Sequence, residues 1–437
     1  MTPEDRATLR NVLAFAIPEL GWGFAWALTL EPPMLAAFGD AFGGSSTVVG
    51  FLGTVFFLGM AIPMLFTGWV VEPMARKKPF VLWGHLATAA VWGLVALAIP
   101  VAAPSGPGLL WPVYVVGVLA FCASLGFLIP GWLGLFGELF EEGRRGRILG
   151  VIFVFNRAGA ALGGEVAHAF LHSGGDPVAT WTWLWGLAFA AGFFLSLPFA
   201  WIDEPLRARP PRVPLRAHLS SLLGALRELP ALRRFVAVDV LASVAFVVAF
   251  CYADVGLRHR GFAQSQAGRW VEIGAAVQVG AALAIAKAGH RIPPRLALAA
   301  GLALAAGAAL LTAFATAPLA YVAIAAASAL FIVSRQTCHA PQVMRLSRGR
   351  DGTNPVAIAL VCVAPVQALG PLLAGWLAAT AGPGPVFLVV AIASAAACIL
   401  LLARVPDASA TPDDPRDAPV AVVTPSGDDG NSVTGSA

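Results

Sequence analysis

About a dozen long apolar segments follow one another along the chain, and they restrict its fold more than any other feature. A helix that crosses a lipid bilayer needs about 20 mostly apolar residues, and only helices and closed barrels satisfy their backbone hydrogen bonds in lipid. Segments of this length predict an all-α integral membrane protein with about twelve transmembrane helices. They lie at residues 11–38, 47–71, 79–101, 110–137, 148–172, 178–202, 233–255, 267–288, 296–316, 317–344, 355–379 and 386–404.

The composition excludes several other classes of protein. Only 12% of the 437 residues are charged and 58% are hydrophobic, whereas soluble domains carry roughly 25% charged residues. The basic residues are spread over many loops, so we expect no nucleic-acid partner. The chain has no Walker, H-E-x-x-H, G-x-S-x-G or C-x-x-C sequence. We therefore expect no enzymatic activity, no cofactor and no bound metal.

The charges of the loops alternate along the chain. Of the 28 lysines and arginines, 23 fall on the side of the membrane that carries the N-terminus, and three (Arg258, Arg260 and Arg269) fall on the other side. Cytoplasmic loops of membrane proteins are enriched in Lys and Arg. We therefore expect a multi-pass protein of the plasma (inner) membrane, surrounded by lipid, with both termini in the cytoplasm.

The longest internal loop divides the apolar segments into six and six. Within residues 203–232, leucines recur at helical spacing, which predicts a short amphipathic helix on the membrane surface. The expected organisation is an N-terminal six-helix bundle at 1–202, this central loop, and a C-terminal six-helix bundle at 233–404. Residues 405–437 are rich in Asp, Pro, Ser, Thr and Gly, which predicts a disordered cytoplasmic tail.

Short basic turns recur at matching places in the two halves of the chain. The loop after the second segment contains Gly68, Glu72, Arg76 and Lys77, and the corresponding loop of the second half contains His290, Arg291 and Arg295. The first loop resembles the G-x-x-x-D-R-x-G-R-R/K signature of the major facilitator superfamily, from which Pro73 and Ala75 depart. This resemblance implies two six-helix bundles, related by a pseudo-twofold axis, that rock around a site at the midplane of the membrane.

The fifth segment resembles, in part, a glycine-rich motif of the antiporter branch of that family. Gly150, Gly159 and Gly163 match the motif, but Gly164 stands where the motif has proline. The partial match implies export of a solute. Gly159 and Gly163 are also small residues four positions apart, which predicts a face that packs closely against another helix.

Ionisable residues share the other face of the fifth segment. At 100° per residue, Arg157, Glu165, His168 and His172 fall within about 80° of one another. Charges inside lipid are costly, so they mark function or a fixed ion pair. Two interpretations stay open: these residues line a substrate cavity and Glu165 carries protons, or Arg157 and Glu165 form ion pairs that hold the bundle together.

Other spans carry ionisable residues as well. The tenth segment places Arg335 and His339 on one stripe, and counting along the helices puts Arg335 and Arg157 near mid-depth. Two arginines at the midplane indicate either an anionic substrate or carboxylate partners. The candidate carboxylates are Glu19 and Glu31 in the first segment and Asp239 in the seventh.

The loop after the second segment has a mechanical interpretation. Glu72 ends one helix, and Arg76 and Lys77 precede the next. Charge pairs at this place that form in only one arrangement of the bundles would bias the equilibrium between the two arrangements. The alternative is that the basic residues of this loop only set the topology.

Together these features predict a monomeric secondary transporter that moves a small organic solute by alternating access and is coupled to protons. The partial antiporter motif favours export, and the two midplane arginines favour the alternative, import of an organic anion. A further hypothesis is a protein of transporter fold that does not transport and acts as a sensor, an assembly factor or a pigment-delivery protein.

Overall fold

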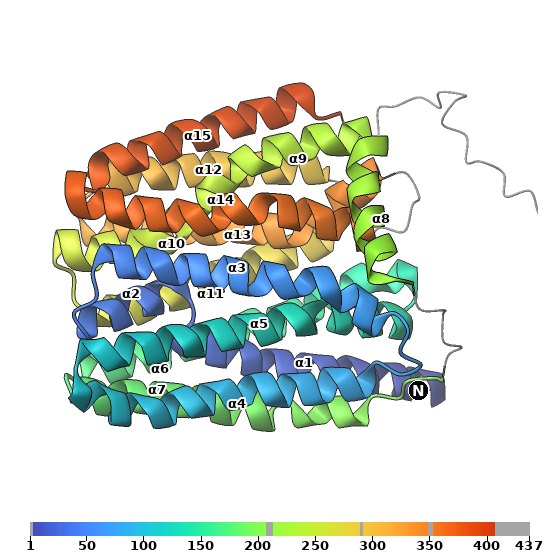
Figure 1. Cartoon of the computed structure of the whole chain (residues 1–437), viewed down its shortest axis with the longest axis horizontal. Helices are drawn as coiled ribbons and strands as arrows, with labels where there is room; N and C mark the ends of the chain where they lie inside the picture. The colour runs from blue at the N-terminus through green and yellow to red at the C-terminus, as the bar shows by residue number, and fades with distance from the viewer. Residues whose placement is uncertain (1–2, 207–212, 289–291, 348–352, 407–437) are drawn as a thin grey trace, which may run out of the picture.

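The computed structural model describes residues 3–206, 213–288, 292–347 and 353–406, and these residues form helices and short loops without a strand (Figure 1). Most helices run alongside one another, and α8 lies across their ends, at the end of the molecule that carries the N-terminus. We call this end the N-terminal face and the other end the opposite face.

The elements are α1 (Pro3–Thr29), α2 (Pro32–Ala41), α3 (Ser46–Val71), α4 (Lys78–Ala102), η1 (Ala103–Ser105), α5 (Pro107–Leu139), α6 (Glu142–His172), α7 (Pro177–Phe194), η2 (Leu197–Trp201), α8 (Leu215–Glu228), α9 (Pro230–Ala242), η3 (Ser243–Ala245), α10 (Phe246–Asp254), η4 (Val255–His259), α11 (Ser265–Ala288), α12 (Pro294–Phe314), α13 (Pro318–Leu346), α14 (Thr353–Ala381) and α15 (Pro383–Arg404).

Eleven helical segments in the described part of the chain are long and apolar enough to cross a membrane. Two of them combine several elements: one joins α1 and α2, and another joins α9, η3, α10 and η4. In addition, α11 is 24 residues long, packs against α6 and α13, and carries Arg269, Glu272 and Gln278 among its apolar residues. The prediction of an all-α membrane protein with about twelve spans is confirmed.

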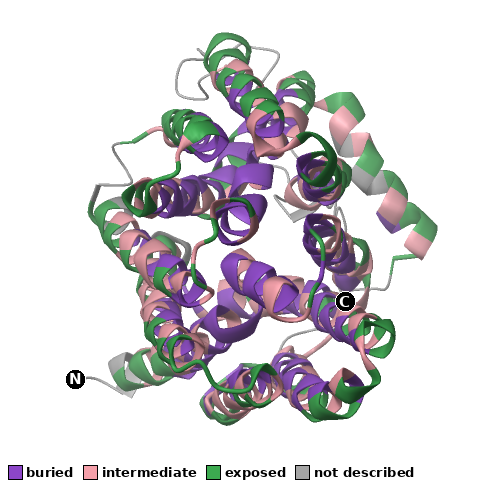
Figure 2. Ribbon diagram, turned by 90° about the vertical axis from the view of Figure 1, so that its left-hand side faces the viewer, coloured by how far each residue is buried: buried purple, intermediate pink, exposed green. Residues whose placement is uncertain are grey.

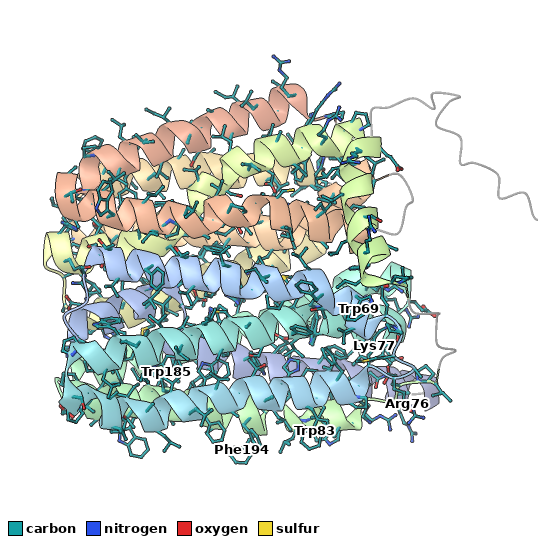
Figure 3. The ribbon with its side chains drawn as sticks, viewed as in Figure 1. Trp69, Arg76, Lys77, Trp83, Trp185 and Phe194 are labelled. Atoms are coloured by element: carbon teal, nitrogen blue, oxygen red, sulfur yellow. The ribbon has the colours of Figure 1, made fainter. Side chains whose placement is uncertain are left out.

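Large apolar side chains cover the outside of this assembly. Trp83, Leu97 and Leu319 are all exposed, and Figure 2 shows buried residues on the inward surfaces of the helices and exposed residues on the outward ones. In Figure 3, Trp83 and Phe194 project from the edge of the ribbon. An apolar outer surface of this extent fits a protein whose surroundings are lipid.

The first span is broken in its middle. The α1 helix ends at Thr29, and the backbone N–H groups of Leu30 and Glu31 both donate to the Trp26 carbonyl. The α2 helix then begins with two prolines, Pro32 and Pro33, which lack N–H donors and disfavour a helical conformation in the residue before them. The sequence predicts one continuous segment at 11–38, whereas the structure has two helices with Glu31 at the break.

Two helix pairs join the N-terminal half (α1–α7) to the C-terminal half (α9–α15): α6 packs on α11, and α3 packs on α14. Glycines permit both crossings. A Cβ on Gly164 would lie 2.5 Å from the backbone nitrogen of Glu272, and a Cβ on Gly268 would clash with the backbone of α6. Gly50 and Gly375 meet the backbone of the facing helix in the same way at the second pair.

The halves also touch at both faces of the molecule. At the opposite face, α2 packs against α10, η4 and α11, and Gln264 Nε2 donates to Asp40 Oδ2 over 2.7 Å. At the N-terminal face, α8 packs against α3 and α14, which belong to different halves. Trp69 Nε1 in α3 donates to the Val213 carbonyl just before α8, over 2.9 Å.

Candidate functional site

A chain of polar contacts crosses the middle of the molecule and is centred on Arg157 of α6. Its Nε donates to Asn156 Oδ1 over 2.9 Å, and its Nη1 donates to Gln278 Oε1 of α11 over 2.8 Å. Asn156 Nδ2 in turn donates to Glu19 Oε2 of α1 over 2.7 Å. With Glu31, these residues form what we call the Arg157 site, and it joins both halves because Gln278 belongs to the C-terminal half.

Glu31 completes the site from the break between α1 and α2. Its Oε1 lies 3.4 Å from Arg157 Nη1, which is long for a charged hydrogen bond. The side chains of Arg157 and Glu31 are 11% and 22% exposed. The site therefore holds two carboxylates and one guanidinium, and it carries one excess negative charge when both carboxylates are ionised.

An aromatic side chain, Phe153, borders the Arg157 site. The guanidinium carbon of Arg157 lies 5.2 Å from the ring centre of Phe153, within the range of a cation–π contact. Trp26, whose carbonyl receives the Glu31 N–H, is partly exposed and meets the rings of Phe56 and Phe121 at 5.4 and 5.7 Å between centres.

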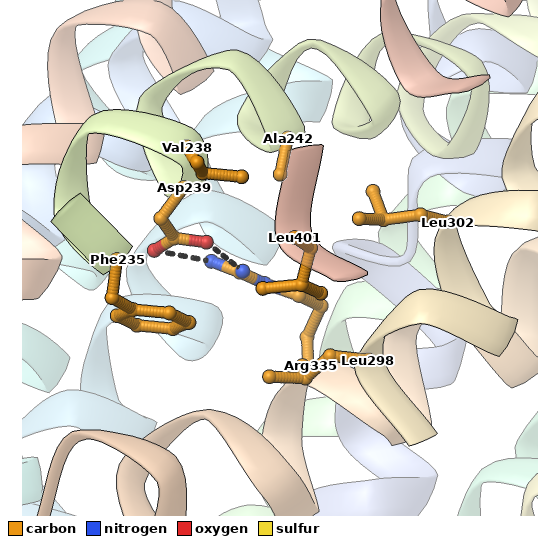
Figure 4. A pocket seen from close by; sticks show the side chains of 8 residues that line it. All are labelled: Phe235, Val238, Asp239, Ala242, Leu298, Leu302, Arg335 and Leu401. Carbon is orange, nitrogen blue, oxygen red and sulfur yellow. Dashed lines mark hydrogen bonds and ion pairs between the residues drawn. The ribbon is translucent and has the colours of Figure 1, made fainter. Parts of the chain in front are cut away.

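A second charged cluster lies within the C-terminal half and consists of Asp239 of α9 with Arg335 and His339 of α13. The Asp239 carboxylate accepts from both terminal nitrogens of Arg335 and lies 2.8 Å from His339 Nε2. Figure 4 shows the paired Asp239 and Arg335 enclosed by apolar side chains such as Leu298 and Leu401. The side chains of Asp239 and Arg335 are only 1% and 8% exposed.

This second cluster, which we call the Asp239 triad, leaves little room for a ligand. The cavity beside it has a volume of about 10 Å³, enough for one water molecule. Arg335 also lies over the Phe246 ring at 5.8 Å. The triad contains one carboxylate and one guanidinium in close contact, so its fixed charges cancel when His339 is neutral.

Each midplane arginine thus has a carboxylate partner, one of the two alternatives that the sequence leaves open. The structure divides six of the candidates predicted from the sequence between the Arg157 site and the Asp239 triad: Glu19, Glu31, Arg157, Asp239, Arg335 and His339. Asn156 and Gln278 were missed, because the analysis considered ionisable residues and these are neutral amides. A polar amide in an apolar span is the sequence signal that marks Gln278.

The remaining residues of the fifth span lie away from Arg157. Glu165 pairs with Arg269 of α11 at 3.4 Å, and both side chains are about half exposed. His168 Nδ1 lies 2.8 Å from the Ser265 carbonyl, and His172, which is exposed, stacks on His168. These residues share a helix face with Arg157, but the helix rises about 1.5 Å per residue. His168 is therefore about 16 Å further along α6 than Arg157.

The loop between α3 and α4 is held within the N-terminal half. Lys77 pairs with Glu138 of α5, and the backbone N–H groups of Lys77 and Lys78 donate to the Glu204 carboxylate. Glu72 and Arg76 form no ion pair with another described residue. Figure 3 places Arg76 and Lys77 at the N-terminal face, near Trp69.

Two other residues of the basic loops after the second and eighth spans make contacts that the sequence did not predict. Gly68 lies against the His218 ring of α8, and Arg295 Nη1 donates to the Val405 carbonyl over 2.6 Å. His290 and Arg291 lie outside the described residues. A charge pair between helices at these loops that forms in only one arrangement of the bundles stays a prediction.

Comparison with known proteins is consistent with this architecture. The sequence model of the Major Facilitator Superfamily matches residues 20–348. No functionally curated protein sequence matches the chain significantly.

Several solved structures are similar to the chain. One is FucP, the E. coli fucose:proton symporter, in its outward conformation (TM-score 0.64, 17% identity, covering 90% of this chain and 98% of that one). Others are a D-xylose-proton symporter (0.68, 14%, 92% and 98%) and the human organic anion transporter MFSD10 (TETRAN) (0.63, 19%, 92% and 100%). Identities this low show a shared fold and leave the substrate of this chain undetermined.

Proposed function

Since the chain belongs to the major facilitator superfamily, a family of secondary transporters, we propose that it moves a small organic solute by alternating access at the Arg157 site, in exchange for protons. Export from the cytoplasm is the proposed direction. Both termini and α8 lie on the cytoplasmic side in this proposal, in agreement with the excess of Lys and Arg in the loops of that side.

The observation that carries this proposal is the hydrogen bond between Arg157 and Gln278, which joins the two halves at the site. Arg157 belongs to the N-terminal half and Gln278 to the C-terminal half. A site built from both halves changes its geometry when one half rocks against the other, and alternating access requires this coupling. The first span is interrupted at Glu31, and the seventh changes to a 3₁₀ turn at η3. Irregular helices of this kind are a feature of transporter binding sites.

The carboxylates of the Arg157 site support the coupling to protons. Two ionised carboxylates beside one guanidinium leave one excess negative charge inside the membrane. Such a charge is costly unless a proton or another cation neutralises it. The expected alternative, import of an organic anion, loses its main support, because each midplane arginine already faces a carboxylate.

Paired spin labels test the alternating-access proposal without a known substrate. In a variant without the five native cysteines, one pair on Ser45 and His259 reports on the opposite face, and one pair on Arg76 and Arg345 reports on the N-terminal face. When pH is changed, we expect one inter-label distance to lengthen as the other shortens. A control pair within the N-terminal half, Ser45 with Ser173, should stay constant. Distances that are fixed in both test pairs over the whole pH range would contradict alternating access.

A further inference from the structure

We propose that the solute carried at the Arg157 site is a monovalent organic cation with an aromatic or other apolar body, and that it exchanges with a proton on Glu31. This inference rests on the proposed function and adds the chemical class of the substrate. Its basis is the charge of the site, the setting of Glu31 and the aromatic side chains around it.

The charge of the site favours a positive ligand. Glu19 and Glu31 face a single guanidinium, and the other two members of the site, Asn156 and Gln278, are neutral amides. One negative charge is therefore left over when both carboxylates are ionised. A proton or a monovalent cation restores neutrality, whereas an anion would double the excess.

The described residues of neighbouring elements do not supply the missing positive charge. The α10 helix packs against α2, and its Tyr252 carries a phenol, which brings no positive charge. The adjacent Asp254 and Arg258 form their own ion pair at 2.7 Å. The Asp239 triad is compensated within itself by Arg335. The excess charge of the Arg157 site therefore remains uncompensated by any described ion pair.

Of the two carboxylates, Glu31 is the one placed to exchange ligands. Glu19 accepts a hydrogen bond of 2.7 Å from Asn156. Among the described residues, the Glu31 carboxylate has only the 3.4 Å contact with Arg157, and the Glu31 side chain is 22% exposed. Glu31 also precedes Pro32 and Pro33, so the first two residues of α2 offer no N–H to its carboxylate. A weakly held, accessible carboxylate can bind a proton or an ammonium group in turn.

The aromatic residues suit an apolar body on the cation. Phe153 flanks Arg157, with its ring centre 5.2 Å from the guanidinium carbon. Trp26, five residues before Glu31, is partly exposed and meets the Phe56 ring. Aromatic faces attract organic cations through their quadrupole and bury apolar groups well. In this arrangement the charge of the solute meets Glu31 while its body lies against the rings.

The exchange is electrically balanced at the site. Protonated Glu31 loses its proton to water on the side from which the solute enters, and the cation takes the place of that proton beside the carboxylate. After the halves rearrange, the cation leaves and Glu31 binds a proton from the other side. The net charge of the Arg157 site is the same in both loaded forms, and one proton crosses for each cation in the reverse direction.

Three small molecules of similar shape test the charge of the substrate: benzyltrimethylammonium (cation), phenylmethanesulfonate (anion) and benzyl alcohol (neutral). Calorimetric titration of the purified full-length protein, repeated in buffers of different ionisation enthalpy, measures affinity and proton release together. We expect the cation to bind at least about tenfold more tightly than the other two, since a tenfold ratio corresponds to 1.4 kcal/mol. About one proton should be released per cation bound when Glu31 starts protonated.

Variants show whether Glu31 is responsible. Glu31→Gln should weaken cation binding by about tenfold and abolish proton release, and Glu31→Asp, which keeps the charge, should retain both in part. Glu272→Gln removes a carboxylate of α11 that pairs with Arg269 and should behave as the wild type. Preference for the sulfonate, binding of none of the three, or cation binding that survives Glu31→Gln would overturn the inference. The spin-label distances test the proposed function separately, because they need no ligand.

Discussion

The Asp239 triad offers a quantitative test of which charged cluster is structural. Asp239 and Arg335 are almost fully buried and in direct contact, and the removal of one partner from a buried ion pair typically costs about 3–5 kcal/mol. Asp239→Leu leaves the permanent charge of Arg335 without a partner, so we expect the full cost of about 3–5 kcal/mol in the free energy of unfolding.

Removing the arginine in place of the carboxylate should lower the free energy of unfolding by less. Arg335→Met leaves Asp239 beside His339 Nε2 at 2.8 Å, and His339 can bind a proton and replace the lost positive charge. We expect a cost of about 1–3 kcal/mol, the range of a charged hydrogen bond. The double variant removes both charges from an apolar surrounding and should lie within about 1 kcal/mol of the wild type, because hydrophobic replacements of whole ion pairs are often neutral.

The assay is reversible unfolding in mixed detergent micelles, with solute uptake measured on the same variants after reconstitution into proteoliposomes. The exposed pair of Arg10 and Asp203 serves as the control, and Asp203→Asn should change the stability by less than about 1 kcal/mol. The reasoning would be refuted if Asp239→Leu left the stability unchanged. It would also be refuted if the double variant were as stable as the wild type but had lost uptake, since the triad would then belong to the transport site.

Two further predictions concern the contacts between the halves and the topology. Gly164→Ala places a Cβ 2.5 Å from the backbone nitrogen of Glu272 and should destabilise the protein by about 1–3 kcal/mol. The matched control is Gly280→Ala in α11, because a Cβ at Gly280 meets no atom within 4 Å. Equal stabilities of the two variants would contradict the close crossing of α6 and α11. Single cysteines at the exposed Ser45 and Ser220 should react with an impermeant reagent from opposite sides of the membrane, and reaction from the same side would rule out the topology.

Much of the fold was predictable because the hydropathy of a span depends only on its own consecutive residues. Lipid requires about 20 apolar residues for each span, so the segments can be counted without any knowledge of their neighbours. The glycine face of the fifth span was also predictable, since spacing alone aligns Gly159 and Gly163, and both lie against α1. The break at Glu31 was missed, although Pro32 and Pro33 provide a local signal for it.

The partners within the sites were not predictable in the same way. Arg157 meets Glu31 across 126 residues of sequence and Gln278 across 121, and Arg335 meets Asp239 across 96. Such pairs depend on how the helices pack, which the periodicity of one helix does not encode. Depth along a helix is equally hidden by a projection down its axis. Glu165 falls within about 80° of Arg157 in that projection but lies in a half-exposed pair with Arg269.

Uptake of benzyltrimethylammonium by proteoliposomes with an acidic lumen tests the central claim most directly. This cation has no proton to lose, so a pH gradient alone cannot trap it. We expect the wild-type protein to concentrate the cation in the lumen above its external concentration, and a protonophore to abolish this accumulation. Glu31→Gln should lack the accumulation, and Glu272→Gln should retain it. A luminal concentration that never exceeds the external one, or accumulation unaffected by Glu31→Gln, would contradict the account.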